Sequence, residues 1–343
     1  METIAFYWGA APVSWRTVLI GLGVLSFVFM LTALRLAQGR RIVPVLIALP
    51  FGAAAAVFLG RAIHWYCLSE DYTSFGAAMT DPGSGGISLI GALAAALLTA
   101  AVLHRIGAEK DIRALLDDTA AAGALGIAAG RLGERFGSAD RGKILIETES
   151  LRRLPFSAPV IHPVSGAEEW RFATFWGQSL WAFVLFLMLM IRFVSLSRKE
   201  PGLREEKKGN GFLLFLTLYC EGQILLDSTR YDALFLRSNG FVSLEQILCC
   251  TVLTALLVLL SFRGIRAGGM APVYPLCWVL FLAGFGLVGY MEYYVQRHGG
   301  TYLLSYSLMA LGLAVVFCSL RPVVFPSRRP QEESEGRKKE EES

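Results

Sequence analysis

Long apolar runs dominate this sequence of 343 residues. Seven runs reach the roughly 17–25 mostly apolar residues that a helix needs to cross a bilayer. Two more, 114–133 and 211–228, are apolar but interrupted by polar groups. A chain in lipid must satisfy its own backbone hydrogen bonds, so we expect an all-α, polytopic integral membrane helix bundle with nine spans. The seven clear runs are 17–36, 43–66, 86–106, 173–196, 244–262, 272–293 and 300–320.

Composition supports a membrane protein. Charged residues make up 17% of the chain, against about 25% in a typical soluble domain. The net charge of +4 is mild and its basic residues lie in loops, so we expect no nucleic-acid partner. The four histidines share no ligand spacing, and no nucleotide or serine-hydrolase motif occurs, so we expect no metal and no cofactor. The first run has no basic region before it and no small-residue cleavage site after it, so we expect no cleavable signal peptide.

The distribution of Lys and Arg predicts the orientation. Basic residues follow the first, third, fifth, seventh and ninth runs, which puts the N-terminus outside and the C-terminus in the cytoplasm. The polar segment 323–343 is expected to be a disordered cytoplasmic tail. The loop at 134–172 breaks the rule because it is basic yet external. Two interpretations stay open: it guides acidic lipid headgroups, or its charges are merely tolerated.

One charged segment ends an otherwise apolar run. It reads Gly130-Arg131-Leu132-Gly133-Glu134 and closes with Gly142. An arginine in the hydrocarbon region costs roughly 2.5–3.5 kcal/mol, so such residues usually face the bundle interior and serve a function. The flanking glycines permit close approach of a backbone or a ligand. The segment therefore predicts a cationic pocket that suits an anionic headgroup.

A second polar stripe follows the run at 211–228. Tyr219, Gln223, Asp227 and Arg230 are spaced at i, i+4, i+8 and i+11, so they share one helical face. Such a face should contact protein or water. It forms either part of the same pocket or a structural ion-pair network.

Two further groups occur at the ends of early runs. Arg61 and His64 lie near the outer end of 43–66, where an arginine can extend to the interface and a histidine can accept a proton or serve only in packing. The segment Gly85-Gly86-Ile87-Ser88 opens the next run. Its glycines permit a helix start that faces an anion, or a flexible loop.

In this order, the motifs resemble the bacterial prolipoprotein diacylglyceryl transferase family. Gly130, Arg131, Gly133 and Gly142 fit its signature, which begins Gly-Arg-x-Gly and closes with a glycine. The resemblance covers about residues 10–265, so 1–265 is expected to be the transferase-like core and 266–322 two additional spans. Other matches are Ser14-Trp15, Gly60-Arg61, Trp65-Tyr66, Gly85-Gly86-Ile87-Ser88, Tyr219, Asp227, Arg230, Ser243 and Gln246.

Several positions depart from the family pattern. Ile90 stands where the family has a histidine, and Glu134 stands for the asparagine of the signature. Gln223 replaces an arginine, and Asp227 replaces a glutamate. The phosphate-binding arginines are therefore better matched than the residues of proton transfer.

The resemblance implies transfer of diacylglyceryl from phosphatidylglycerol to the cysteine of a prolipoprotein, which presents its signal peptide at the bacterial plasma membrane. This reaction belongs to lipoprotein biosynthesis. Arg131 and Arg230 are expected to hold the phosphate. Either His64 or Glu134 takes the thiol proton, or nearby arginines lower the pKa of the thiol enough. A phospholipid-binding relative without activity and a small-molecule or lipid transporter are the alternatives. The residues expected to bind substrate are Arg61, Ser88, Gly133, Gly142, Tyr219, Gln223 and Asp227.

Overall fold

The computed structural model forms two compact units, residues 1–250 and 251–343, and the helix α10 runs from one into the other. It describes residues 3–67, 69, 72–80, 88–137, 140–161, 166–235, 240–266, 273–299 and 301–324. The motif residues 85–87 and the tail from 325 onward lie outside this range.

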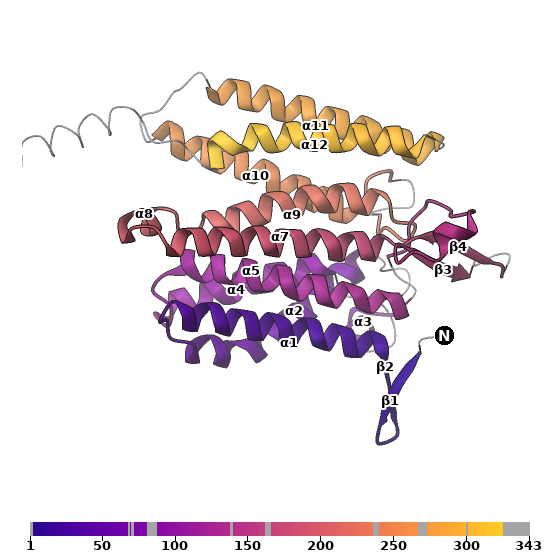
Figure 1. The fold of residues 1–343 in the computed structure, drawn as a ribbon, viewed down its shortest axis with the longest axis horizontal. Coiled ribbons are helices and arrows are strands. Elements are labelled where there is room, and N and C mark those ends of the chain that lie inside the picture. The colour runs from indigo at the N-terminus through magenta and orange to yellow at the C-terminus, as the bar shows by residue number, and fades with distance from the viewer. Residues whose placement is uncertain are drawn as a thin grey trace, which may run out of the picture. The chain divides into compact units, whose positions relative to one another are not determined.

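Each of the nine apolar runs corresponds to one helix (Figure 1). Six of these helices are long and apolar enough to cross a membrane, and many of their large apolar side chains are exposed on the surface. The predicted all-α membrane bundle is confirmed, and the chain is a multi-pass membrane protein. The number of crossings stays a prediction. The helices are α1 (Trp15–Ala37), α2 (Val43–Cys67), α4 (Leu89–Arg105), α5 (Ile112–Arg131), α7 (Thr174–Ser197), α9 (Asn210–Ser228), α10 (Leu244–Arg266), α11 (Val273–His298) and α12 (Tyr302–Val324).

Two antiparallel hairpins were not expected from the sequence. β1 (Ile4–Trp8) pairs with β2 (Ala11–Ser14), and β3 (Ser157–Ile161) pairs with β4 (Glu168–Phe172). Figure 1 shows both at the end of the first unit where α1 and α7 begin. They are the water-exposed end of that unit if the helices span a bilayer. The short helices are α3 (Phe75–Thr80), η2 (Leu132–Phe136), α6 (Glu149–Arg152) and α8 (Pro201–Glu206).

Helix α5 is the centre of the first unit. Its alanines at 120, 121 and 124 pack with Leu34 of α1, Leu185 of α7 and Phe215 of α9. On its other side, Ala122 and Leu115 pack against α1, α2 and α4. Small side chains let several helices approach one axis closely, which is how helices associate in lipid. The C-terminal end of α5, where Arg131 lies, is thereby surrounded by neighbouring helices.

Glycine contacts hold α2 against α4. A Cβ added at Gly91 of α4 would lie 2.4 Å from the backbone nitrogen of Gly60 in α2. A Cβ at Gly123 of α5 would meet no atom within 4 Å. Close backbone packing thus requires a glycine at position 91 but not at 123.

We expect Gly91→Ala to destabilise the protein by about 1–3 kcal/mol, because two helix backbones must separate to admit the methyl group. The matched variant Gly123→Ala should be neutral or stabilise by up to about 1 kcal/mol, since alanine favours a helix interior. Thermal unfolding of both variants in detergent measures the difference. Equal stability of the two would show that α2 and α4 are not in close contact.

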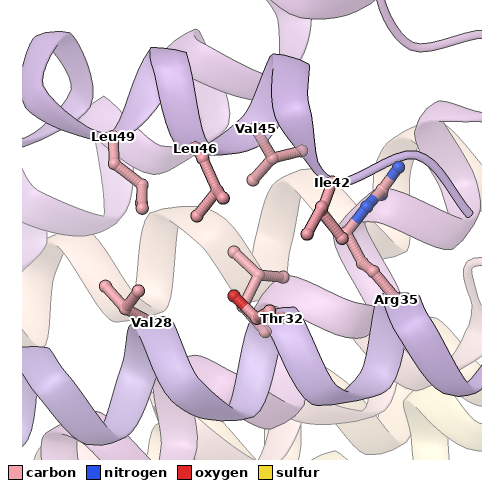
Figure 2. A pocket seen from close by; sticks show the side chains of 8 residues that line it. Val28, Thr32, Arg35, Ile42, Val45, Leu46 and Leu49 are labelled. Atoms are coloured by element: carbon pink, nitrogen blue, oxygen red, sulfur yellow. The ribbon is translucent and has the colours of Figure 1, made fainter.

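The far end of α1 carries an ion-pair network rather than a ligand site. Figure 2 shows mainly apolar side chains of α1 and of segment 42–49 facing one another, with Arg35 at one end, and the space between them has no room for a water molecule. Arg35 is buried; it pairs with Glu109 and donates to the carbonyl of Arg41 at 2.9 Å. Its guanidinium is therefore used to join α1 to the start of α5.

The second unit contains α11 and α12 as an antiparallel pair. A Cβ added at Gly284 would lie 2.8 Å from the carbonyl oxygen of Gly312, so small residues again bring two backbones together.

Candidate functional site

Arg131 is the last residue of α5, so its charge lies at the end of the bundle rather than at its middle. Its Nη1 donates to Oδ2 of Asp140. Asp140 has a positive φ of 56°, a left-handed backbone conformation that aspartate tolerates better than most residues. This turn directs the buried carboxylate of Asp140 toward the helix end.

Arg230 lies two residues beyond α9, and all three of its guanidinium nitrogens are engaged. Nε lies 2.9 Å from Oδ1 of Asp140 and 3.3 Å from Oδ1 of Asp232. Nη1 lies 2.9 Å from Oδ1 of Asp227 and 3.3 Å from Oε2 of Glu245. Nη2 donates to the carbonyl of Asp232 at 3.4 Å. Asp140 therefore bridges the two arginines.

Backbone pairing fixes this geometry. Gly142 and Arg230 form an antiparallel bridge, and the N–H of Lys143 donates to Thr229 O at 2.7 Å. On its other side Gly142 donates to Phe172 O at 2.6 Å. A Cβ on Gly142 would lie 2.7 Å from the same oxygen, so only glycine fits here. The closing glycine of the motif thus serves backbone packing beside Arg230.

The start of α10 completes the cluster. Ser243 and Gln246 form a reciprocal cap: Gln246 N–H donates to Ser243 Oγ at 3.2 Å, and Ser243 N–H donates to Gln246 Oε1 at 2.9 Å. Such a capping box fixes the first turn of a helix. Ser243 Oγ also donates to Asp227. The cap therefore joins α10 to α9 and holds Glu245 beside Arg230.

The cluster differs from the cationic pocket that the sequence predicts. Two arginines face four carboxylates, those of Asp140, Asp227, Asp232 and Glu245. Arg230 has no nitrogen without a partner. Arg131 has its contact through Nη1 alone, no partner of its Nε or Nη2 occurs among the described residues, and its side chain is 16% exposed. Arg131 is therefore the arginine of this cluster that still offers N–H groups to a ligand.

Other residues predicted from the sequence lie on α9 and η2. Tyr219 is buried and is an electrostatic neighbour of Arg131. Gln223 accepts from Gln178 at 3.3 Å, and its Nε2 is buried with no partner among the described residues. A Cβ on Gly133 would lie 3.0 Å from a carbonyl oxygen of α1. Glu134 pairs instead with Arg16, whose Nη2 lies 2.9 Å from Oε1.

Arg61, His64 and Ser88 form a second group around α2 and α3. Arg61 donates to Ala78 O at 2.7 Å, and His64 Nδ1 lies 3.1 Å from the hydroxyl of Tyr72. Ser88 N–H donates to Gly60 O at 3.1 Å, while its buried hydroxyl has no partner among the described residues. These three contacts join α2 to α3, to Tyr72 and to the start of α4.

Sequence reasoning missed Asp140 and Asp232. Both flank residues that it had selected, since Asp232 follows Arg230 by two positions and Asp140 precedes Gly142 by two. A carboxylate two positions in sequence from a residue already expected in the site was a signal that the sequence alone contained. The pairing of Arg16 with Glu134 spans 118 residues and had no local signal.

The comparison with known proteins now identifies the family. A family model described as prolipoprotein diacylglyceryl transferase matches residues 3–262. The chain belongs to this family. The matched range includes every residue of the cluster around Arg131 and Arg230, and it ends before α11.

Individual relatives agree with this assignment. The chain is similar to the phosphatidylglycerol–prolipoprotein diacylglyceryl transferase of Bacillus velezensis, 27% identical over 277 residues, which is 78% of this chain and 93% of the relative. The enzyme of the same name from Bacillus licheniformis is 26% identical over 266 residues (74% and 92%). That of Parasynechococcus marenigrum is 28% identical over 236 residues (67% and 81%).

In this transferase family member, most basic side chains of the loop at 134–172 hold the loop itself together. Arg135 donates to Ser157 O at 3.2 Å, and Arg152 donates to Ile146 O at 3.1 Å. Arg141 donates to Gly137 O at 2.8 Å, and Arg171 pairs with its neighbour Glu169 at 2.7 Å. These contacts support a structural role for the charges, which neither interpretation of the sequence included.

Acid should weaken the cluster through Asp140. Burial raises the pKa of its carboxyl, but Arg131 and Arg230 outweigh that effect and hold the pKa below the ordinary 3.8. A carboxyl with a lowered pKa stabilises the fold above its unfolded pKa, and the contribution disappears as pH falls through the folded value. We expect wild type to exceed Asp140→Asn in stability by about 1–3 kcal/mol at pH 5–7. The difference should shrink below pH 3.8, as thermal unfolding at several pH values will show.

Proposed function

We propose that this protein transfers diacylglyceryl from phosphatidylglycerol to the cysteine of a prolipoprotein, and that the cluster around Arg131 is its active site. The carrying observation is that Arg131 has N–H groups without a partner among the described residues and lies at the end of a buried ion cluster, within the range matched by the family model. A planar guanidinium binds phosphate oxygens through paired hydrogen bonds and stays charged.

The two arginines have different roles in this proposal. Arg131 contacts the phosphate of the lipid, because its Nε and Nη2 have no partner in the part of the chain that the structure describes. Arg230 is a positioning residue, since its contacts to Asp140, Asp227 and Glu245 leave no nitrogen for a ligand. Asp140 holds Arg131 in place and bridges it to Arg230. Tyr219, Gln223 and the glycines at 133 and 142 line or support the same site.

The reaction is a displacement at carbon. The thiolate sulfur of the acceptor forms a bond to the terminal glycerol carbon of the diacylglyceryl group, and the bond from that carbon to the phosphate oxygen breaks. The electron pair leaves on glycerol phosphate, whose growing charge Arg131 stabilises. The thiol proton passes to a base or to the departing phosphate monoester, whose second pKa is about 6.

Glu134 is the stronger of the two candidate bases. Its Oε2 is buried without a partner among the described residues, and it follows Arg131 by three positions. His64 contacts Tyr72 instead. We expect Glu134→Gln to lower kcat by about 10²–10³-fold and His64→Ala to change it less than about threefold. Measured transfer rates of the two variants distinguish the two bases. A larger loss in His64→Ala than in Glu134→Gln would assign the thiol proton to His64.

The proposal includes an orientation. The N-terminus, both hairpins and the Arg131 cluster lie on the outer side of a bacterial plasma membrane, and the C-terminus lies in the cytoplasm. This side is where a secreted prolipoprotein presents its cysteine next to its signal peptide. Lys and Arg in the alternate loops support this orientation.

Complementation tests the function. The chain is produced in a bacterium depleted of its own transferase, together with a tagged prolipoprotein. Lipidation that requires Arg131 supports the proposal. A well-inserted chain that binds phosphatidylglycerol without lipidating the substrate would instead be an inactive lipid-binding relative.

A further inference from the structure

The loop between η2 and α7 contains an open pocket of about 390 Å³. Its walls are mainly apolar and come from the segment 144–148, Leu151 of α6, Phe156 and Phe172. The proposed reaction at Arg131 does not use it. An apolar pocket on a water-exposed subdomain indicates a binding site for an apolar group.

The pocket lies beside a strand edge that continues from the arginine cluster. Segment 142–146 pairs with β4 on one side, where Phe172 N–H donates to Ile144 O at 2.9 Å. On the other side it pairs with Thr229 and Arg230, but only at its beginning, through residues 142 and 143. Further along the same edge, Leu145 N–H has no partner among the described residues, and its side chain is 51% exposed.

An unpaired edge next to an apolar pocket fits an extended peptide. Main-chain hydrogen bonds to the edge supply affinity, and the pocket selects a side chain. Along a strand alternate residues face the same edge, so Leu145 follows Lys143 as the next position that offers its N–H and C=O. A peptide bound there would lie in line with residues 229–230.

We propose that this edge and pocket bind the prolipoprotein segment that directly follows the acceptor cysteine. The inference rests on the proposed function. Leu145 lies three positions after Gly142, which is paired with Arg230, and at about 3.3 Å per residue this is about 10 Å. With the cysteine at the arginine cluster and the peptide parallel to segment 142–146, the third residue after the cysteine reaches the pocket.

The position of the membrane indicates which segment of the prolipoprotein, the one before or the one after the cysteine, can reach the pocket. The signal peptide that precedes the cysteine is apolar and stays with the bilayer, whereas the following residues enter water on the side of the loop between η2 and α7. The pocket therefore selects a large apolar side chain about three positions after the cysteine. Glu147 at its wall disfavours an acidic one.

Two leucines provide a matched test. Leu151 lines the pocket and is 43% exposed, while Leu154 does not line it and is 39% exposed. For a peptide with leucine three positions after the cysteine, Leu151→Ala should raise KM for the peptide about tenfold and leave kcat unchanged. Leu154→Ala should change neither. Leu145→Pro, which removes the edge N–H, should also raise KM. Equal KM values in wild type, Leu151→Ala and Leu145→Pro would overturn the inference.

A binding readout separates this inference from the proposed function. A peptide with serine in place of the cysteine and photoleucine three positions later cannot be lipidated but can be cross-linked. Transfer activity is measured separately, with the peptide that carries the cysteine. Cross-links of the serine peptide mapped to residues 144–156, together with no transfer to the cysteine peptide, would support the peptide site and contradict the transferase. Transfer activity with cross-links elsewhere would contradict the peptide site alone.

Discussion

Arg131→Gln is expected to lower the rate of diacylglyceryl transfer by about 10²–10³-fold, the loss seen when one donor to a developing negative charge is removed. The fold should survive, because Asp140 keeps its second contact, to Arg230 at 2.9 Å. Initial rates with saturating phosphatidylglycerol, measured alongside thermal unfolding, separate the two effects.

Arg153→Gln is the matched control for this experiment. Arg153 is also an arginine with a single carboxylate partner, Glu149 at 3.2 Å, but its side chain is 80% exposed. Exposed ion pairs contribute little, so activity and stability should not change. Arg131→Lys should recover only part of the rate, because an ammonium lacks the planar fork of a guanidinium. Full activity of Arg131→Gln would exclude Arg131 as the phosphate ligand.

Arg230→Met should destabilise the protein by about 3–5 kcal/mol, the range found when one partner of a buried ion pair is removed. Without it, Asp227 and Glu245 lose their cation inside the bundle, and Asp140 retains only Arg131. Transfer should also be lost, because the loop that carries Asp140 is no longer held. Thermal unfolding in detergent provides the measurement.

A double variant tests whether unpaired carboxylates cause the loss of stability in Arg230→Met. Arg230→Met combined with Asp227→Leu removes one of the carboxylates left without a cation, so it should recover part of the lost stability. A measurement of phosphatidylglycerol binding by Arg230→Met tests the alternative that Arg230 contacts the phosphate directly. If Arg230→Met were as stable as wild type but failed to bind the lipid, Arg230 would be a direct phosphate ligand rather than a positioning residue.

The helices were predictable because lipid imposes a simple rule. Every backbone polar group in the bilayer must be satisfied within the element, so apolar length alone indicates a helix. Even the run at 114–133, weakened by Asp117 and Asp118, is helical; Asp117 accepts from the N–H groups of Gly209 and Phe212, and Asp118 accepts from Gln38. Charges in that run are compatible with a helix because neighbouring segments satisfy them.

The hairpins and the carboxylates around the arginines depend on contacts between distant segments. β3 and β4 are short strands within a highly charged loop, without the apolar alternation that marks a half-buried strand. Asp140 reaches Arg230 because residues 141–143 pair with 229–231, about ninety positions away. Local sequence patterns do not predict pairing between segments this far apart. The sequence therefore predicted Arg230 and Asp227 on one face, in a pocket or an ion-pair network, but not that Asp140, Asp232 and Glu245 would also face the arginines.

The most direct test of the transferase is a reaction with purified components. The chain in micelles that contain phosphatidylglycerol is mixed with a peptide bearing the acceptor cysteine, and intact mass is measured. We predict a peptide heavier by one diacylglyceryl group, release of glycerol phosphate, and neither product with Arg131→Gln. An unchanged peptide mass with folded wild-type protein that still binds phosphatidylglycerol would contradict the account.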